Sequence, residues 1–302
     1  FFEGAAKAAR LHPQADPAKH DVEVLRDLAY RNTGRHEHRL DIYRSSRHAG
    51  PMPVVLYLHG GGFRILSKDT HWIMGLVFAK RGYLTILPNY RLAPKHPFPA
   101  AMEDAAASYA WVREFAARYG GDPDRLIVAG ESAGANLSMA VTAAACFPRD
   151  LPYARQVWEA GPVPRVCLPA CGILQVSDPE RFKRDKPSIN RFANDRIGEV
   201  SRAYLPDVGA LDPAARDFVD PLLLLEGDEE PERPLPPFFT GVGTADPLLP
   251  DTRRLAAALE RRGIPHEAHY YKGEVHAFHA FVFREAAKQF WKAQFAFLDQ
   301  HL

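Results

Sequence analysis

Short apolar segments alternate with longer segments of helical periodicity along most of the chain. Residues 54–58 are an uninterrupted apolar run between a proline and a histidine, which is typical of a strand buried on both faces. Strands are predicted at residues 22–28, 38–43, 54–58, 83–87, 125–129, 166–170, 238–242 and 267–271. Helices are predicted at about residues 1–11, 70–80, 100–118, 133–146, 251–262 and 277–299. Because strands and helices alternate, we expect an α/β fold with a mostly parallel central sheet and helices on both faces.

The alternation is interrupted once, between residues 175 and 221. This segment is polar and rich in basic residues, unlike the apolar strands on either side of it. Its basic residues include Arg181, Lys183, Arg184, Arg191, Arg196 and Arg202. We interpret it as an insertion that lies over the sheet rather than within it. A solvated helical lobe with only a packing role is the alternative.

The overall composition argues against two classes of protein. The chain has 302 residues, of which 46% are hydrophobic and 25% are charged, and this is ordinary for a globular protein. The net charge is +1, which argues against a nucleic-acid-binding protein that relies on bulk positive charge. No apolar run approaches the ~18 residues of a membrane-spanning helix. We therefore expect one or two globular domains with no membrane span and no nucleic-acid partner.

The cysteines and histidines predict neither a disulfide framework nor a metal site. Cys146, Cys167 and Cys171 are too few, and odd in number, for a disulfide scaffold. We expect them to be small buried apolar residues in a reducing compartment, which favours a cytoplasmic protein. Residues 36–38, His-Glu-His, alternate across a predicted strand without a third ligand, so we predict no metal there. The chain begins Phe-Phe-Glu-Gly without a signal pattern or an initiator Met, so a removed leader remains open.

A sharp turn is predicted at residues 130–134, Gly-Glu-Ser-Ala-Gly. It follows one predicted strand and begins the helix at 133–146, with Ser132 at its apex. Glycines at both ends allow the close backbone approach that such a turn needs. The hydroxyl is then exposed at the carboxyl end of the sheet, where such folds bind ligands, next to a helix N-terminus. Ser132 is therefore the candidate nucleophile, and a chance glycine-rich turn is the alternative.

A second glycine-rich segment, His-Gly-Gly-Gly-Phe at residues 59–63, directly follows the strand at 54–58. Its glycines leave two or more main-chain N–H groups free to point at one spot. Together with the N–H of Ala133 they would stabilise an oxyanion, with each donor worth about 10²–10³ in rate. A flexible loop is the alternative. His59 is expected to brace the loop rather than to act as a base.

A nucleophilic serine needs a base and a carboxylate that orients the base. In a fold of this kind the chain order is serine, acid, histidine, with the last two on loops after later strands. Asp246 follows the strand at 238–242 within Gly-Thr-Ala-Asp-Pro, so we favour it as the acid. Asp251 is the rival, and we expect it to cap the N-terminus of the helix that ends before Gly263.

His276 is the favoured base among the thirteen histidines. It follows the strand at 267–271, at the edge of the sheet where Ser132 is expected. His266 and His269 lie at or within that strand, and His279 is expected one turn into the next helix. His276 is therefore the histidine that a loop can bring to the serine.

Together these motifs resemble the hormone-sensitive-lipase-like esterases of the α/β-hydrolase fold, over most of the chain. The matching segments are His-Gly-Gly-Gly-Phe at 59–63, Tyr-Arg-Leu-Ala-Pro at 90–94, His-Pro-Phe-Pro-Ala at 96–100, Gly-Glu-Ser-Ala-Gly at 130–134, Asp-Pro-Leu at 246–248 and His-Ala-Phe at 276–278. The resemblance implies Ser132 as nucleophile, Asp246 as acid and His276 as base. It implies no cofactor and no metal.

The same resemblance implies the remaining site residues and the division of the chain. The implied oxyanion-hole donors are the N–H groups of Gly61, Gly62 and Ala133. The implied α/β-hydrolase core is 21–174 and 222–302, and the implied helical cap is 1–20 and 175–221. Three positions depart from the family pattern: Glu131 replaces the usual Asp or Thr, Lys95 the usual Glu, and Asn89 the usual Asp. We expect them to affect substrate or loop details rather than the triad.

The resemblance implies a hydrolase of carboxylic esters, with a small-molecule ester of short-to-medium acyl chain as substrate. A homodimer is a reasonable expectation for such a protein. An acyltransferase or an amidase with the same triad remains an alternative. A non-catalytic small-molecule receptor on the same fold is the alternative of another class. Such receptors lose part of the triad, whereas Ser132, Asp246 and His276 are all present here.

Overall fold

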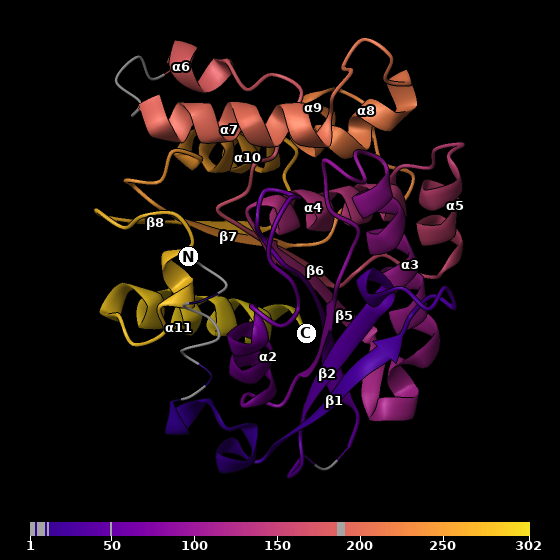
Figure 1. Cartoon of the computed structure of the whole chain (residues 1–302), viewed down its shortest axis with the longest axis vertical. Helices are drawn as coiled ribbons and strands as arrows, with labels where there is room; N and C mark the ends of the chain where they lie inside the picture. The colour runs from indigo at the N-terminus through magenta and orange to yellow at the C-terminus, as the bar shows by residue number, and fades with distance from the viewer. Residues whose placement is uncertain (1–3, 5–9, 11, 49, 186–190) are drawn as a thin grey trace.

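An eight-stranded sheet forms the centre of the molecule (Figure 1). The computed structural model of the chain describes every residue except 1–3, 5–9, 11, 49 and 186–190. The strands are β1 (Val22–Ala29), β2 (Arg39–Ser45), β3 (Met52–Leu58), β4 (Leu84–Pro88), β5 (Gly121–Glu131), β6 (Val166–Ala170), β7 (Phe238–Gly243) and β8 (His266–Tyr271). They follow the order β1-β2-β4-β3-β5-β6-β7-β8. The β1–β2 and β2–β4 pairings are antiparallel and the others are parallel, which confirms the predicted mostly parallel sheet.

The strand order brings two loops together that are far apart in the sequence. β3 lies between β4 and β5, so the chain leaves β3 toward one side of the sheet and later returns on the other side. Leu58, the last residue of β3, pairs with Gly130 near the end of β5. The segments that follow β3 and β5 therefore begin side by side at the carboxyl edge. A reversal of strand order at this edge is where open α/β sheets bind ligands.

Helices cover both faces of the sheet (Figure 1). One face carries α3 (Ala100–Phe115), α4 (Ala133–Cys146), α5 (Pro152–Glu159) and α10 (Leu249–Arg261), and the other carries α2 (Trp72–Ala79) and α11 (Glu285–His301). Residues of β3 alternate between the two apolar cores: Val54 and Leu56 face one, and Val55 and Tyr57 face the other. Both faces of this strand are buried, which is why it is apolar at successive positions.

α4 is buried along its whole length, and most of its residues are Ala, Gly or Ser. A helix that is apolar all round belongs in the interior, and small side chains let neighbouring backbones approach it. Its one amide side chain, Asn136, donates hydrogen bonds to the carbonyl oxygens of Ile173 (3.0 Å) and Val219 (2.9 Å). The helix that begins directly after Ser132 is therefore held on all sides.

Helices also occupy the segment that interrupts the alternation of strands and helices. These inserted helices are α6 (Arg181–Asp185), α7 (Arg191–Tyr204), α8 (Pro213–Val219) and α9 (Pro221–Glu226), so they continue beyond the predicted end at residue 221. Figure 1 shows α6 and α7 outside α10 and α4, on the far side of the molecule from α2. The segment is not simply solvated, because the side chain of Arg181 is buried.

The histidine-rich segment at residues 36–38 forms a 3₁₀ turn, so the predicted strand position was wrong. Its third residue, His38, turns inward, and its Nε2 lies 3.1 Å from Oδ1 of the buried Asp104. The Nδ1 of the same ring lies 2.5 Å from the hydroxyl of Thr33. Because both ring nitrogens have partners inside the protein, His38 has a structural role.

Two helix predictions also need correction. The last helix begins at Glu285 rather than at residue 277, because residues 278–280 form a 3₁₀ turn after Ala277, whose φ is 55°. His279 therefore lies in this turn and not in a helix. The helix α5 was not predicted, although it buries Tyr153, Ala154 and Val157 on one face.

The remaining predictions concern single features. Cys146, Cys167 and Cys171 are buried and free, as expected. The helix predicted at 1–11 lies outside the described residues, apart from residues 4 and 10. In the described part of the chain, none of the helices has the length and apolar character needed to cross a bilayer.

Candidate active site

Ser132 occupies a strained turn between β5 and α4. Its backbone angles are φ 55° and ψ −117°, a region that costs a residue with a side chain about 1–3 kcal/mol. A Cβ added to Gly134 would lie 2.0 Å from the carbonyl oxygen of Leu58, and one added to Gly130 would lie 2.4 Å from the oxygen of Gly134. A hydrogen bond helps to stabilise this backbone conformation, because the Ser132 N–H donates to the carbonyl oxygen of Ala170 at 3.0 Å. This is the sharp strand-to-helix turn that presents a serine hydroxyl at the edge of a sheet.

The loop after β3 turns back on itself at two glycines with positive φ. Gly61 has a φ of 113° and Gly62 has a φ of 59°. A Cβ on Gly61 would lie 2.1 Å from the carbonyl oxygen of Ile65, which itself faces into the turn. Among the described residues, no acceptor takes the N–H groups of Gly61 and Gly62. The N–H of Ala133, the first residue of α4, has no partner within its helix.

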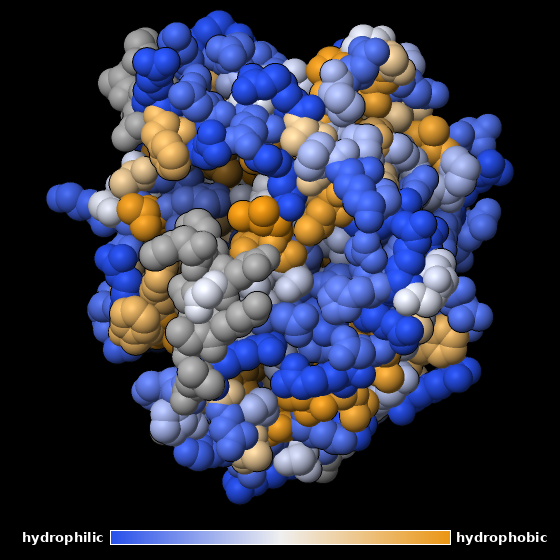
Figure 2. Space-filling view, viewed as in Figure 1, coloured by the Kyte–Doolittle hydropathy of each residue, from blue (hydrophilic) through white to orange (hydrophobic). Residues whose placement is uncertain are grey.

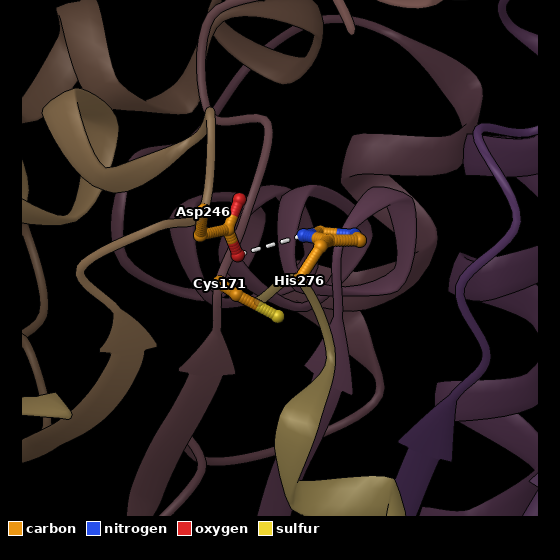
Figure 3. A group of neighbouring side chains, drawn as sticks. All are labelled: Cys171, Asp246 and His276. Atoms are coloured by element: carbon orange, nitrogen blue, oxygen red, sulfur yellow. Dashed lines mark hydrogen bonds and ion pairs between the residues drawn. The ribbon is translucent and has the colours of Figure 1, made fainter. Parts of the chain in front are cut away.

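His276 and Asp246 form a hydrogen-bonded pair at the ends of β8 and β7 (Figure 3). The Nδ1 of His276 lies 2.8 Å from Oδ2 of Asp246. Asp246 is buried, and its other oxygen accepts the N–H of Leu248 at 2.8 Å. Burial lowers the pKa of His276, but the charge and hydrogen bond of Asp246 outweigh it, so this pKa lies above its ordinary value. The imidazole is thus oriented by a fixed carboxylate while its side chain stays 36% exposed.

Cys171 links this pair to the serine turn. Its thiol lies with Asp246 and His276 in one group whose donor atoms are within 4.8 Å of one another (Figure 3). The same thiol interacts with the backbone of Ser132 and of Ala277. Burial raises the pKa of this thiol well above its usual value, and the carboxylate and imidazole already bond each other. The arrangement therefore fits an oriented imidazole beside the serine turn better than a metal site.

Asp251, the rival acid, serves a different purpose. Its Oδ2 accepts the N–H of Leu174 at 2.8 Å and a charged hydrogen bond from Arg181 at 2.5 Å. Burial raises its pKa against the opposing effect of Arg181. The expected N-cap role was wrong, because α10 begins at Leu249 and Asp251 lies inside its first turn. Asp251 joins an inserted helix to the core.

The other candidate histidines have local partners. His59 stacks on Tyr90 with 4.1 Å between ring centroids, and its Nδ1 lies 2.7 Å from the carbonyl of Gly60. Burial lowers its pKa to about 3, so the ring is neutral, in keeping with a bracing role. On β8, His266 Nδ1 lies 2.9 Å from the carbonyl of Ile264, and His269 Nε2 lies 2.8 Å from the carboxylate of Glu267.

The hydrogen-bond partners of Glu131 were not predicted from the sequence. It precedes Ser132, is buried, and its carboxylate receives His71, His279 and Tyr57 as hydrogen-bond partners. A glutamate at the end of an apolar strand could have indicated such a cluster, because a buried carboxylate needs several hydrogen-bond donors. The sequence contained nothing that identified those donors.

The other two departures from the family pattern, Asn89 and Lys95, differ in their surroundings. The Oδ1 of Asn89 accepts the N–H of Lys68 at 2.8 Å, and its Nδ2 lies 3.3 Å from the carbonyl of His36. Asn89 therefore fastens the segment that follows the glycine-rich loop. Lys95 is exposed.

Helix α7 packs directly on the glycine-rich loop. A Cβ on Gly62 would lie 2.6 Å from a methyl carbon of Val200. Phe63 stacks on Tyr204 with 3.7 Å between ring centroids, and Arg64 pairs with Glu199. Helix α7 therefore forms one wall above the glycine-rich loop.

Comparison with known proteins identifies the family of the chain. Residues 55–280 match the family described as alpha/beta hydrolase fold. The carboxylesterase NlhH of Mycobacterium tuberculosis is 32% identical over 229 residues, which are 75% of this chain and 66% of that protein. The esterase LipI of the same organism is 32% identical over 228 residues, which are 75% of this chain and 65% of that protein. The chain thus spans just under two thirds of the length of these relatives.

Solved structures show the same architecture over nearly the whole chain. Esterase LipW from Mycobacterium marinum has a TM-score of 0.76 at 25% identity, covering 99% of this chain and 87% of that one. Esterase B from Lactobacillus rhamnosis has a TM-score of 0.76 at 18% identity, covering 99% of this chain and 94% of that one. With the matched family and these relatives, the chain belongs to the alpha/beta hydrolase fold family and, within it, to the hormone-sensitive-lipase-like esterases.

Proposed function

We propose that the protein is a carboxylic ester hydrolase with Ser132 as nucleophile, His276 as base and Asp246 as the orienting acid. The observation that carries this proposal is the hydrogen bond between His276 Nδ1 and Asp246 Oδ2, next to a serine held in a strained turn. The esterase names of its relatives support the same class of reaction.

The first half of the reaction forms an acyl-enzyme. His276 takes the proton of the Ser132 hydroxyl through Nε2 as the oxygen attacks the ester carbonyl. Asp246 holds Nδ1–H, which fixes the tautomer and stabilises the imidazolium that forms. The carbonyl oxygen becomes an oxyanion, and the N–H groups of Gly61, Gly62 and Ala133 would receive it. His276 then gives its proton to the leaving alcohol, and the ester C–O bond breaks.

The second half repeats these steps with water. His276 takes a proton from water as the water oxygen attacks the acyl carbon. The same N–H groups receive the second oxyanion, and Ser132 Oγ leaves with the proton from His276. The products are a carboxylic acid and an alcohol, and no cofactor enters the balance.

We further propose that the inserted helices form a cap that sets substrate size; residues 1–20, the other part of the expected cap, lie partly outside the described residues. Figure 2 shows apolar side chains gathered on the face below α7, with polar side chains outside them. Exposed apolar side chains lie in the segments that border the candidate site, namely Ile65 after the glycine-rich loop, Val275 beside the base, and Phe281 just beyond. Such a surface favours uncharged esters. A methyl group of Val200 fills the place where a Cβ on Gly62 would lie, which limits the space next to the proposed oxyanion donors and favours short-to-medium acyl chains.

A chain-length series of p-nitrophenyl esters tests the proposal. Wild-type protein should hydrolyse them, with a maximum at short-to-medium acyl chains, and Ser132→Ala should lose turnover. Ser46→Ala, at an exposed position at the end of β2, is the matched control and should keep it. Product analysis with added alcohols, and a matched amide, separates hydrolysis from acyl transfer and amidase activity. Turnover that survives in Ser132→Ala would contradict the proposal.

A further inference from the structure

The carboxylate of Glu131 lies at the centre of a buried hydrogen-bond cluster immediately before the nucleophile. Its side chain is only 7% exposed. The Nε2 of His71 lies 2.6 Å from its Oε1. The Nε2 of His279 lies 2.8 Å from its Oε2, and the hydroxyl of Tyr57 donates to the same oxygen at 3.0 Å. Both carboxylate oxygens are therefore fixed.

The cluster is electrostatically consistent. Burial alone would favour the neutral carboxyl, but the charges and hydrogen bonds of His71 and His279 outweigh it and hold the pKa of Glu131 well below its usual value. An ionised carboxylate only accepts hydrogen bonds, so each ring donates through Nε2. The Nδ1 of His279 is buried without a hydrogen-bond partner among the described residues, so Nε2 is the nitrogen through which this ring bonds Glu131.

Each donor belongs to a different part of the candidate active site. His279 lies three residues after His276, and Trp291 of α11 donates to its carbonyl at 3.0 Å. His71 ends the segment that begins at the glycine-rich loop. The ring of His71 lies 5.4 Å, centroid to centroid, from that of His59 at the start of this loop, and a Cβ on Gly60 would lie 3.0 Å from Cγ of Glu131.

We propose that Glu131 is a positioning residue that fixes the base loop and the glycine-rich loop relative to Ser132. Its main chain leads directly into Ser132, and its carboxylate holds the base loop through His279 and the glycine-rich loop through His71. This inference rests on the proposed function. A misplacement of about 1 Å among reacting groups costs roughly 10²-fold in rate, so such a link acts on kcat.

A structural role and a positioning role differ in their electrostatic signature. The groups that act on the base are Asp246, from the loop after β7, and Glu131, from the end of β5; the thiol of Cys171 also lies beside it. Burial lowers the pKa of His276, Asp246 raises it most, and Glu131 raises it further. Replacing the carboxylate with an amide therefore moves the acid limb of the rate profile to lower pH. Loss of packing alone leaves that limb in place.

The first experiment compares Glu131→Gln with wild type on one p-nitrophenyl ester from pH 5 to 8. We expect kcat to fall by about 10–100-fold, with a much smaller change in KM, and the acid limb to move to lower pH. Asp104→Asn is the matched control, because Asp104 is a buried carboxylate that bonds Arg91, Arg31 and His38 and is not among the groups that shift the pKa of His276. It should lower the melting temperature and leave the acid limb unchanged.

The second experiment uses His279 and decides the matter even if Glu131→Gln does not fold. His279→Gln retains an N–H donor toward the carboxylate, and His279→Phe removes it. We expect kcat to be substantially higher in His279→Gln than in His279→Phe. Equal losses in both variants, or a Glu131→Gln protein with wild-type kcat and acid limb, would overturn the inference. Turnover that persists in Ser132→Ala would instead overturn the proposed function, so the two failures are distinguishable.

Discussion

The Nδ1 of His276 lies 2.8 Å from Oδ2 of Asp246, and thirty residues separate the two in the chain. The pairing depends on two neighbouring parallel strands, β7 and β8, which end at the same edge of the sheet. A carbonyl group also joins the two loops, since the oxygen of Glu274 accepts the N–H of Ala245 at 3.0 Å. The orientation of the imidazole is therefore built into the core.

Asp246→Asn should lower kcat by about 10⁴-fold with little change in KM, because the amide permits the wrong imidazole tautomer without changing the shape of the site. Steady-state kinetics on one activated ester measures this. The control is Asp228→Asn, an exposed residue after α9, which should behave as wild type. A full-activity Asp246→Asn protein would remove Asp246 from the mechanism.

Activity should fall as the pH drops, with the midpoint above the ordinary histidine value of about 6.5. The reason is that Asp246 raises the pKa of His276 against the effect of burial, so the base becomes protonated at a higher pH. Above that midpoint the neutral base is present and the rate is constant. The measurement is kcat/KM from pH 5 to 8 with unfolding monitored in parallel; a flat profile would exclude His276 as the base.

Gly61→Ala should lower kcat by about 10²–10³-fold, since the methyl group meets the Ile65 carbonyl at 2.1 Å and must displace an N–H group that we propose as an oxyanion donor. Gly263→Ala is the matched control. Gly263 also has a positive φ, 64°, but nothing lies within 4 Å of its Cβ position, so the cost is confined to local backbone strain. Equal kcat values for the two variants would show that the loop after β3 does not bind the oxyanion.

Asp251→Ala should destabilise the protein by about 3–5 kcal/mol, because it leaves the charge of Arg181 buried without a partner. The double variant Asp251→Leu with Arg181→Met should recover most of the loss, since neither charge then remains. Denaturant unfolding of the single and double variants measures the difference. A single variant as stable as wild type would show that this ion pair does not join α6 to the core.

The local parts of the candidate site could be predicted from the sequence, and the long-range parts could not. The glycines around Ser132 and at 60–62 are local signals, because a strained turn requires them wherever it occurs. The choice between Asp246 and Asp251 was harder, since both follow the same strand within a few residues. Sequence position favoured Asp246. In the structure Asp246 bonds His276, whereas Asp251 bonds Arg181.

The cluster around Glu131 shows the limit most clearly. His71 and His279 are 60 and 148 residues from it, and no periodicity or motif joins them. The helix expected at 277–299 also placed His279 in the wrong element. The sequence does not reveal the positive φ of Ala277, which delays the start of the helix to Glu285. Only the packed fold brings these side chains together.

The most direct test of the account is to label the protein with a fluorophosphonate and to locate the adduct by mass spectrometry. The account predicts one adduct per chain, on Ser132, with ester turnover lost in proportion to labelling and no adduct in Ser132→Ala. An adduct on another residue that abolishes turnover, or full turnover after complete labelling of Ser132, would contradict it.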